Sequence, residues 1–215
     1  MDYCELIVES ARRMADAGFT VATWGNVSAR DPETGLVYLT PSGMAYNSIG
    51  AADVVVCAPD GTIASGTRKP TVEKEMHLAI YRARRDVNAI VHTHPIYSMV
   101  YACRGKDIPL FTDEAAQTLG DTCRTAKYAL PGSIELAENV CEALGEKANA
   151  CLLRSHGALC VGGDMDTALR VCTVLEITAR IGYMIESVGD TPEPISGENI
   201  AYMQDFIRNH YGQGK

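Results

Sequence analysis

The chain carries at residues 89–95 the stretch Ala89-Ile90-Val91-His92-Thr93-His94-Pro95. Three apolar residues run directly into two histidines, and a proline ends the run. Because residues i and i+2 of a strand point to the same face, His92 and His94 are predicted to project together from a strand end, where binding sites are built. Neutral imidazole is the commonest metal ligand and suits zinc. The spacing alone is equally compatible with two histidines held by local hydrogen bonds.

A third histidine favours the metal. Residues 150–157 repeat the pattern, since an apolar run ends in His156 at a predicted strand terminus and a glycine follows. Three histidines at two strand ends are the ligand set of a catalytic zinc site with one open position. Glu73 is the carboxylate best placed along the chain to be a fourth ligand or a base. It could instead form a metal pair with His77 on one helix face, or simply join Glu75 in a first helical turn, where the macrodipole favours anions.

The composition excludes several classes of protein. The net charge of -8 and the pI near 5.1 give no broad electrostatic footprint for nucleic acid, although a small basic patch can occur in an acidic protein. No apolar run approaches the roughly 20 residues of a membrane span, and the first residues lack a secretory signal. None of the 8 cysteines forms a Cys-x-x-Cys pair. We therefore expect a cytoplasmic protein with reduced thiols.

Periodicity and turn residues predict an α/β protein. Besides the two strands that carry the histidines, we expect helices at 2–17, 72–81, 96–103, 113–119, 133–144, 164–188 and 196–211, and strands at 19–23, 36–40, 53–58, 62–64, 127–130 and 158–161. Predicted helix caps are Asp2, Thr71, Thr112 and Ser133, with Gly18 ending the first helix. No repeat or linker interrupts this pattern, which predicts one domain over residues 1–215 with a mainly antiparallel sheet covered by helices.

Five segments together point to a family. They are Gly25-Asn26-Val27-Ser28-Ala29-Arg30, Thr40-Pro41-Ser42-Gly43, Lys69-Pro70-Thr71-Val72-Glu73 followed by His77-Leu78, His92-Thr93-His94-Pro95, and Ser155-His156-Gly157. In this order and spacing they resemble the class II aldolase/adducin-head family, which includes L-fuculose-1-phosphate aldolase and L-ribulose-5-phosphate 4-epimerase. The resemblance runs nearly end to end.

The resemblance implies a three-layer α/β/α sandwich with a central, mainly antiparallel sheet. It also implies a C4-like homotetramer with active sites between neighbouring subunits. Zinc, or another divalent cation such as Mn²⁺ or Co²⁺, would be held by His92, His94 and His156. Glu73 would ligate the resting metal and then swing away to act as the base, while the metal stabilises the enediolate of dihydroxyacetone phosphate.

The family also assigns a purpose to the glycine-containing loops. From the residues alone, a plain turn was the simpler reading of the first loop, although its backbone N–H groups could face an anion. The resemblance implies that the substrate phosphate lies among Gly25, Asn26, Ser42, Gly43 and Thr71. Backbone N–H groups and short hydroxyls near a helix start suit such an anion.

Two further residues are candidates through the family alone. A tyrosine near the C-terminus of the aldolases acts as an acid or substrate contact from a neighbouring subunit, and Tyr211 stands at that place; the alternative is a loose tail residue. The fuculose-phosphate enzymes carry a catalytic tyrosine in the segment matching 111–116, whereas this chain has none there. The epimerases use an aspartate in that neighbourhood, which keeps Asp113 as a catalytic candidate, although helix N-terminal charge explains it too.

The chain also departs from the family beside the base. The aldolases have two serines before the glutamate, and this chain has Thr71 and Val72. One hydroxyl is retained and one lost, so phosphate could be held differently, or a carboxylate could replace it.

The leading expectation is a zinc-dependent aldolase that cleaves a ketose 1-phosphate to dihydroxyacetone phosphate and an aldehyde. The alternatives are a sugar-phosphate 4-epimerase, a decarboxylase or dehydratase of the same family, and a non-catalytic adducin-like module.

Overall fold

An eight-stranded sheet forms the centre of the computed structural model, which describes residues 1–211 of the chain. The strands lie in the order β4-β3-β2-β1-β5-β8-β7-β6. Their bounds are β1 (Asn26–Arg30), β2 (Val37–Leu39), β3 (Val55–Cys57), β4 (Ile63–Ser65), β5 (Ala89–Thr93), β6 (Thr125–Ala126), β7 (Ala150–Leu153) and β8 (Gly157–Gly162). The β6–β7 pair is parallel and the other pairs of this sheet are antiparallel.

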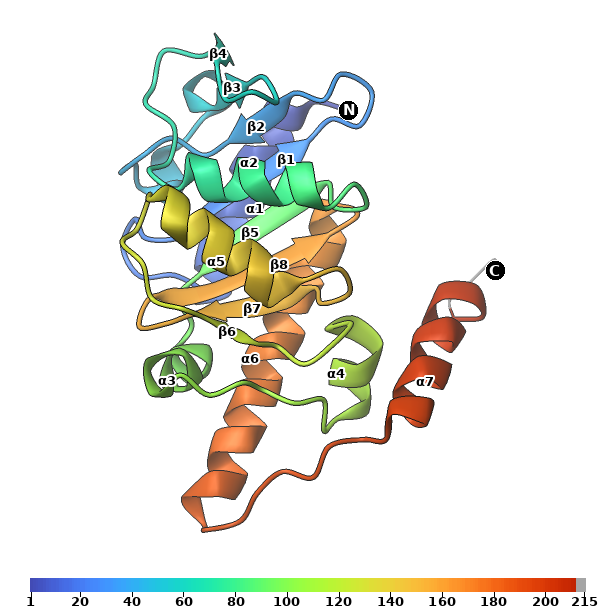
Figure 1. Cartoon of the computed structure of the whole chain (residues 1–215). Coiled ribbons are helices and arrows are strands. Elements are labelled where there is room, and N and C mark those ends of the chain that lie inside the picture. The colour runs from blue at the N-terminus through green and yellow to red at the C-terminus, as the bar shows by residue number, and fades with distance from the viewer. Residues whose placement is uncertain (212–215) are drawn as a thin grey trace.

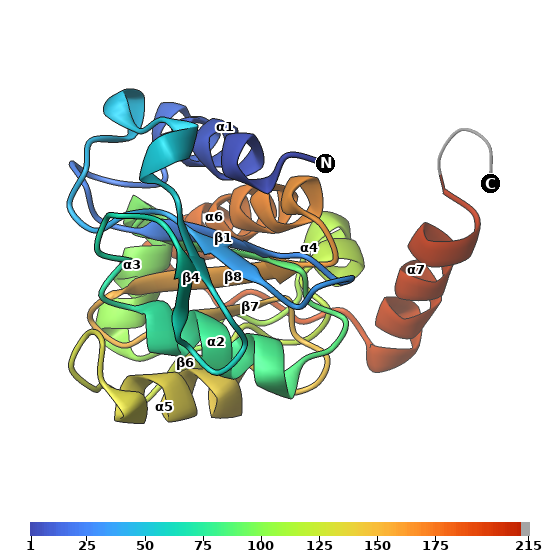
Figure 2. The same cartoon turned by 90° about the horizontal axis from the view of Figure 1, so that it is seen from above.

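Helices cover both faces of this sheet (Figures 1 and 2). The helices are α1 (Tyr3–Asp16), α2 (Lys74–Ala83), α3 (Ile96–Arg104), α4 (Asp113–Thr118), α5 (Ile134–Leu144), α6 (Met165–Ser187) and α7 (Gly197–Asn209), with short 3₁₀ turns at Tyr46–Ser48 and Ala51–Asp53. One apolar cluster packs α1, α3, α4 and α6 against one face, and a second packs α2 and α5 against the other. The expected three-layer α/β/α sandwich with a mainly antiparallel sheet is confirmed.

β5 supplies both apolar layers. Ala89 and Val91 belong to the cluster on one face and Ile90 to the cluster on the other, as strand alternation requires. The strand pairs with β1 on one side and β8 on the other, and each of its residues is buried. This central position explains why the run before His92 is apolar throughout rather than alternating.

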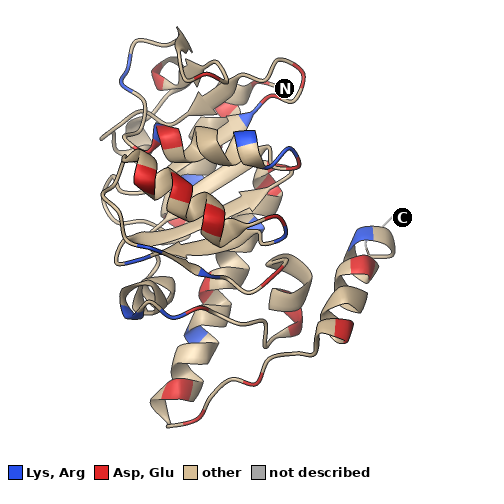
Figure 3. Ribbon diagram, viewed as in Figure 1, with Lys and Arg blue, Asp and Glu red and all other residues tan. Residues whose placement is uncertain are grey.

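The outer helices show the expected amphipathic pattern. In α5, Leu136 and Val140 are buried, whereas the exposed side carries Glu135, Glu138 and Glu142 (Figure 3). Three predicted caps are confirmed by hydrogen bonds from backbone N–H groups to the side chains of Asp2, Thr112 and Ser133. Gly18 follows α1 with φ +73, as a helix-ending glycine should.

The start of α2 differs from the prediction. Thr71 is not its N-cap, because the helix begins at Lys74 and Glu73 occupies the cap position. The Thr71 N–H donates to the Thr40 carbonyl, and Pro41 bridges to Pro70, so this segment stays extended beside the end of β2. The hypothesis that Glu73 lies in the first turn of this helix is therefore wrong. As the cap residue, Glu73 precedes the helix, and its carboxylate does not have to follow the direction of helical side chains.

Two predicted strands are also wrong. Residues 19–23 form a loop, because the Phe19 carbonyl accepts from the N–H of His94 and Ala22 adopts φ 56. The strand expected at 127–130 lies instead at β6, where Thr125 and Ala126 align with β7. Among residues 1–211, no helix combines the length and apolarity that a membrane crossing requires.

Replacing Ile90 by alanine tests the central position of β5. The side chain is 0% exposed, so Ile90→Ala is expected to lower the free energy of unfolding by about 2–5 kcal/mol, measured by urea denaturation. The matched control is Ile63→Ala on β4, where the side chain is 55% exposed and the loss should be well below 1 kcal/mol. Equal losses for the two variants would contradict this packing.

Candidate active site

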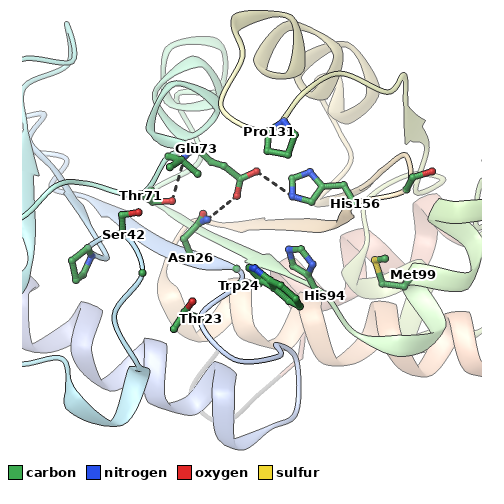
Figure 4. Close-up of a pocket in the computed structure, with 15 residues that line it drawn as sticks. Thr23, Trp24, Asn26, Ser42, Thr71, Glu73, His94, Met99, Pro131 and His156 are labelled. Carbon is green, nitrogen blue, oxygen red and sulfur yellow. Dashed lines mark hydrogen bonds and ion pairs between the residues drawn. The ribbon is translucent and has the colours of Figure 1, made fainter.

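Several chain segments meet at one edge of the sheet. Because β1 and β8 run antiparallel to β5, both begin where β5 ends, and Asn26 lies directly opposite His92. His94 follows β5 and His156 precedes β8. The N-terminus of α2 brings Glu73 to the same place (Figure 4).

The three predicted histidines form a compact cluster. Each of His92, His94 and His156 offers a ring nitrogen, and these atoms all lie within 4.8 Å of one another. The Nε2 atoms of His92 and His94 are 3.0 Å apart. Burial lowers the pKa of His92 and His156 to about 4 and that of His94 to about 3, so all three rings are neutral near pH 7. A neutral imidazole presents the lone pair that a metal needs.

Glu73 lies against this cluster. Its Oε2 is 3.2 Å from His92 Nε2, and its Oε1 is 3.3 Å from His156 Nε2. The residue is buried, and Oε1 has no hydrogen-bond partner. Oε2 accepts a hydrogen bond of 2.8 Å from the side-chain amide of Asn26. One oxygen of the carboxylate is thus held by the protein and the other is not.

The donor set fits a divalent cation. His92 Nδ1 is 2.9 Å from the carbonyl oxygen of Ala158, which can only accept, so Nδ1 carries the proton and the Nε2 lone pair faces inward. That lone pair points at Glu73 and His94, an arrangement that is repulsive unless a cation or a shared proton lies between them. A backbone carbonyl that fixes the tautomer of a ligating histidine is typical of metal sites. Three imidazoles and one carboxylate form a ligand set suited to zinc.

A tight hairpin aims His156 into this cluster. Ser155 adopts the left-handed conformation with φ 55, and Leu153 pairs with Gly157 across the loop. A Cβ atom on Gly157 would lie 2.4 Å from the Thr93 carbonyl oxygen and 3.0 Å from Cε1 of His92. Only glycine allows the two strand ends to approach this closely.

A cavity of about 580 Å³ opens beside the cluster. The five residues proposed for phosphate all line it, together with Glu73, His94 and His156: Gly25, Asn26, Ser42, Gly43 and Thr71. The structure thus brings the histidine cluster and the glycine-containing loops to one cavity (Figure 4).

Other residues of the cavity wall were not expected. Thr23, Trp24, Met99 and Pro131 also line it. Sequence patterns gave little signal for them, because they come from loops and from one helix whose approach depends on the tertiary fold.

The loop before β1 is secured by a buried tyrosine and a glycine. The Tyr46 hydroxyl donates to the Gly25 carbonyl at 2.6 Å. Gly25 has φ +85, and a Cβ atom there would lie 2.7 Å from the His92 carbonyl oxygen. The backbone of this loop is therefore in direct contact with the end of β5, which carries His92.

Asp113 and Tyr211 do not reach the cavity of this chain. Asp113 is exposed at the first position of α4, where Thr112 caps the helix. Tyr211 is 63% exposed just after α7, which projects away from the body of the molecule (Figure 1). Within residues 1–211 of one chain, neither side chain lines the site that the other candidates form.

The alternative of a metal pair formed by Glu73 and His77 does not agree with the structure. His77 is 0% exposed and belongs to α2, whereas Glu73 lies outside the helix. The His77 ring bonds to Asn26 through Nε2 and to Ser28 through Nδ1. The signal that could have revealed this role is the polar pair Asn26 and Ser28 on one face of a buried strand, because buried polar groups need partners.

Gly157→Ala tests how the strand ends position the histidines. The added methyl group must push apart the Thr93 backbone and the His92 ring, so we expect a loss of about 1–3 kcal/mol in unfolding free energy and weaker zinc binding. Denaturant titration and isothermal calorimetry measure the two effects. Gly197→Ala is the control, because a Cβ there meets nothing within 4 Å. Zinc affinity unaltered by Gly157→Ala would contradict the geometry.

Comparison with known proteins independently supports the family that the sequence motifs indicate. The family described as Class II Aldolase and Adducin N-terminal domain matches residues 5–183. A 5-deoxy-D-ribulose 1-phosphate aldolase of Bacillus thuringiensis is 36% identical over 186 residues, covering 86% of each chain. An L-ribulose-5-phosphate 4-epimerase of Salmonella paratyphi B is 32% identical over 211 residues, covering 91% of this chain and 92% of the relative.

A solved structure agrees with the sequence relatives. An L-fuculose 1-phosphate aldolase superposes with a TM-score of 0.92 at 30% identity, covering 96% of each chain. The chain therefore belongs to the class II aldolase and adducin N-terminal domain family.

Proposed function

We propose that this protein is a zinc-dependent aldolase that cleaves a ketose 1-phosphate into dihydroxyacetone phosphate and an aldehyde. The observation that carries the proposal is the clustering of His92, His94 and His156 beside one cavity, with the carboxylate of Glu73 against them: Oε2 is 3.2 Å from His92 Nε2, and the unpartnered Oε1 is 3.3 Å from His156 Nε2. The aldolases among the relatives, named for 5-deoxy-D-ribulose 1-phosphate and L-fuculose 1-phosphate, support a sugar phosphate as the substrate.

The zinc would be held by His92, His94 and His156 and, in the resting enzyme, also by Glu73. Mn²⁺ and Co²⁺ could bind the same ligands, which suit them less specifically. When bound, zinc supplies Lewis acidity that stabilises negative charge developing on substrate oxygens. The protein contributes ring orientation, since the Ala158 carbonyl fixes the tautomer of His92. Burial of the rings keeps them neutral, so no proton competes with the metal near pH 7.

The phosphate of the substrate would lie in the part of the cavity lined by Gly25, Asn26, Ser42, Gly43 and Thr71. These residues offer a primary amide, two hydroxyls and backbone N–H groups, all of which are donors to phosphate oxygens. The nearby start of α2 adds the positive end of a helix dipole. Val72 is 66% exposed at this wall and offers no side-chain donor, so phosphate binding depends more on Thr71 and Ser42.

Glu73 would move the proton at carbon. Its Oε1 lacks a hydrogen bond and faces the cluster, so this atom would take up the proton that the hydroxyl group beside the breaking carbon–carbon bond loses as the aldehyde forms, and would then deliver that proton to the dihydroxyacetone phosphate carbon. Oε2 remains held by Asn26. The side chain therefore has one fixed end and one reactive end.

Tyr211 and Asp113 could take part in the reaction only if several copies of the chain assemble. A homotetramer with active sites between subunits would allow Tyr211 of one chain to approach the cavity of its neighbour. The projection of α7 and the exposure of Tyr202 and Phe206 on it support such an arrangement. Asp113 would serve as an acid or base only if a neighbouring chain carried it to the same cavity.

The second candidate is a sugar-phosphate 4-epimerase, which the similarity to the Salmonella epimerase favours. Such an enzyme would break and remake the same kind of bond with the aldehyde turned over. A decarboxylase or dehydratase is a weaker alternative. A non-catalytic adducin-like module is the weakest, because the complete set of three histidines and Glu73 would have no purpose in it.

Incubation of the zinc-loaded protein with candidate substrates distinguishes these functions. We expect L-fuculose 1-phosphate or 5-deoxy-D-ribulose 1-phosphate to release dihydroxyacetone phosphate, detected by coupled reduction with NADH. Removal of the metal with a chelator should abolish release, and added zinc should restore it. Conversion of L-ribulose 5-phosphate to xylulose 5-phosphate, without cleavage of either aldolase substrate, would favour the epimerase. Protein that binds no divalent metal would overturn both enzymes.

Glu73→Gln tests the assigned base. The amide keeps the size of the side chain but cannot take up the proton, so kcat should fall by about 10²–10⁴-fold while the fold remains. Cys103→Ser on the exposed side of α3 is the control, because that thiol lies outside the cavity lining and its loss should leave kcat within about twofold. Turnover of the Gln variant near that of the unmodified enzyme would remove Glu73 from the mechanism.

A further inference from the structure

Buried side chains form a chain of hydrogen bonds that leads from Tyr81 on α2 to Glu73, the proposed base. Tyr81, Ser28, His77, Asn26 and Glu73 contact one another in this order. The successive distances are 2.8 Å from the Tyr81 hydroxyl to Ser28 Oγ, 2.6 Å to His77 Nδ1, then 2.6 Å from His77 Nε2 to Asn26 Oδ1. All five residues are buried. Ser28, His77 and Tyr81 have no part in the proposed chemistry. The desolvation cost of burying these polar groups is therefore not explained by that chemistry.

The direction of every hydrogen bond in this chain follows from the carboxylate. Glu73 Oε2 accepts, so the amide nitrogen of Asn26 must face it and Oδ1 must face His77. An amide oxygen also accepts, so His77 Nε2 must carry the ring proton. The ring is 0% exposed and its two nitrogens bond to an amide and a hydroxyl group rather than to a carboxylate, so no anion balances a second ring proton and the ring is neutral.

The other half of the chain is then fixed as well. His77 Nδ1 has no proton and accepts from the Ser28 hydroxyl. Ser28 has donated its only hydrogen, so the Tyr81 hydroxyl must donate to Ser28 Oγ. Each hydrogen bond therefore fixes the direction of the next one along the chain. If one bond alone reversed its direction, two acceptors or two donors would face each other.

We propose that His77, as the Nε2–H tautomer, is a positioning residue that holds the Asn26 amide with its nitrogen toward Glu73. The amide then fixes Oε2 of Glu73 and leaves Oε1 as the only oxygen free to exchange a proton. A primary amide carries two N–H hydrogens, so the second remains available to the cavity that Asn26 lines. A reversed amide would present its oxygen to the carboxylate and to substrate phosphate, and both contacts would become repulsive.

The catalytic part of this inference rests on the proposed function, whereas the tautomer does not. Nitrogen NMR of metal-free protein labelled with ¹⁵N-histidine reads the tautomer directly, with His77 assigned by its absence from a variant. We expect a protonated Nε2 and an unprotonated Nδ1 for His77. Ser28→Ala removes the donor to Nδ1 but leaves the acceptor Asn26 Oδ1 in place, so the Nε2–H tautomer should persist in that variant. A native protein with the proton on Nδ1 of His77 would overturn the proposal whether or not any aldolase activity is found.

Two substitutions of matched polarity test the effect on turnover. His77→Gln can place an amide N–H near the position of Nε2 and donate to Asn26, whereas His77→Asn is too short to reach it. We expect kcat/KM of His77→Asn to fall about 10–100-fold, and that of His77→Gln to stay within a few-fold of the unmodified enzyme. Both values are corrected for the folded fraction measured by thermal unfolding.

A purely structural role for His77 predicts a different result. Loss of packing would lower the folded fraction of both variants and leave KM for the sugar phosphate unchanged. Positioning of Asn26 instead predicts a higher KM for His77→Asn, because the amide that faces phosphate is lost. Equal corrected kcat and KM for the two variants would overturn the positioning role, and absence of turnover in the unmodified enzyme would count against the aldolase instead.

Discussion

The antiparallel pairing of β5 with β1 and β8 is the constraint on which the rest of the structure depends. Antiparallel neighbours begin where the central strand ends, so three chain segments far apart in sequence deliver their polar ends to one edge of the sheet. His92 thereby lies opposite Asn26, and the hairpin before β8 carries His156 to the same edge. Shifting β5 by one residue would turn His92 toward the opposite face and bring the apolar side chain of Val91 to its position.

Burial determines the protonation state of the histidine rings at this edge of the sheet and the hydrogen bonding that the Glu73 carboxylate requires. The rings of the cluster lie in an environment that disfavours their charged forms, so their pKa values are lowered and their lone pairs are available. A carboxylate in the same environment requires compensation by a cation or by hydrogen bonds. Asn26 compensates one oxygen of Glu73, and the remaining oxygen faces the histidines. The two oxygens of one carboxylate thus differ, since Oε2 is held by a hydrogen bond and Oε1 has none.

Much of this arrangement was predictable from the sequence. Strand alternation placed His92 and His94 on one face, and the repeated pattern before His156 supplied the third ring. The layers followed from amphipathic helices such as α5, whose capping residue Ser133 was also predicted. These features are local, and local patterns determine them.

The errors arose where long-range contacts override local preference. Thr71 has a good capping side chain, yet its backbone pairs with Thr40, and so α2 begins later. His77 stands four residues from Glu73, a spacing that suggests a shared helix face, but Glu73 is not helical. Tyr211 could be suggested only by the family, because one chain places it on a projecting segment.

The location of the metal tests the account most directly. Crystals of zinc-loaded protein, measured with X-rays at the zinc absorption edge, would show anomalous density only where zinc is bound. The account predicts one strong peak at about 2.0–2.1 Å from a ring nitrogen of each of His92, His94 and His156. A map with no peak at the three histidines, or with zinc bound only elsewhere, would contradict it.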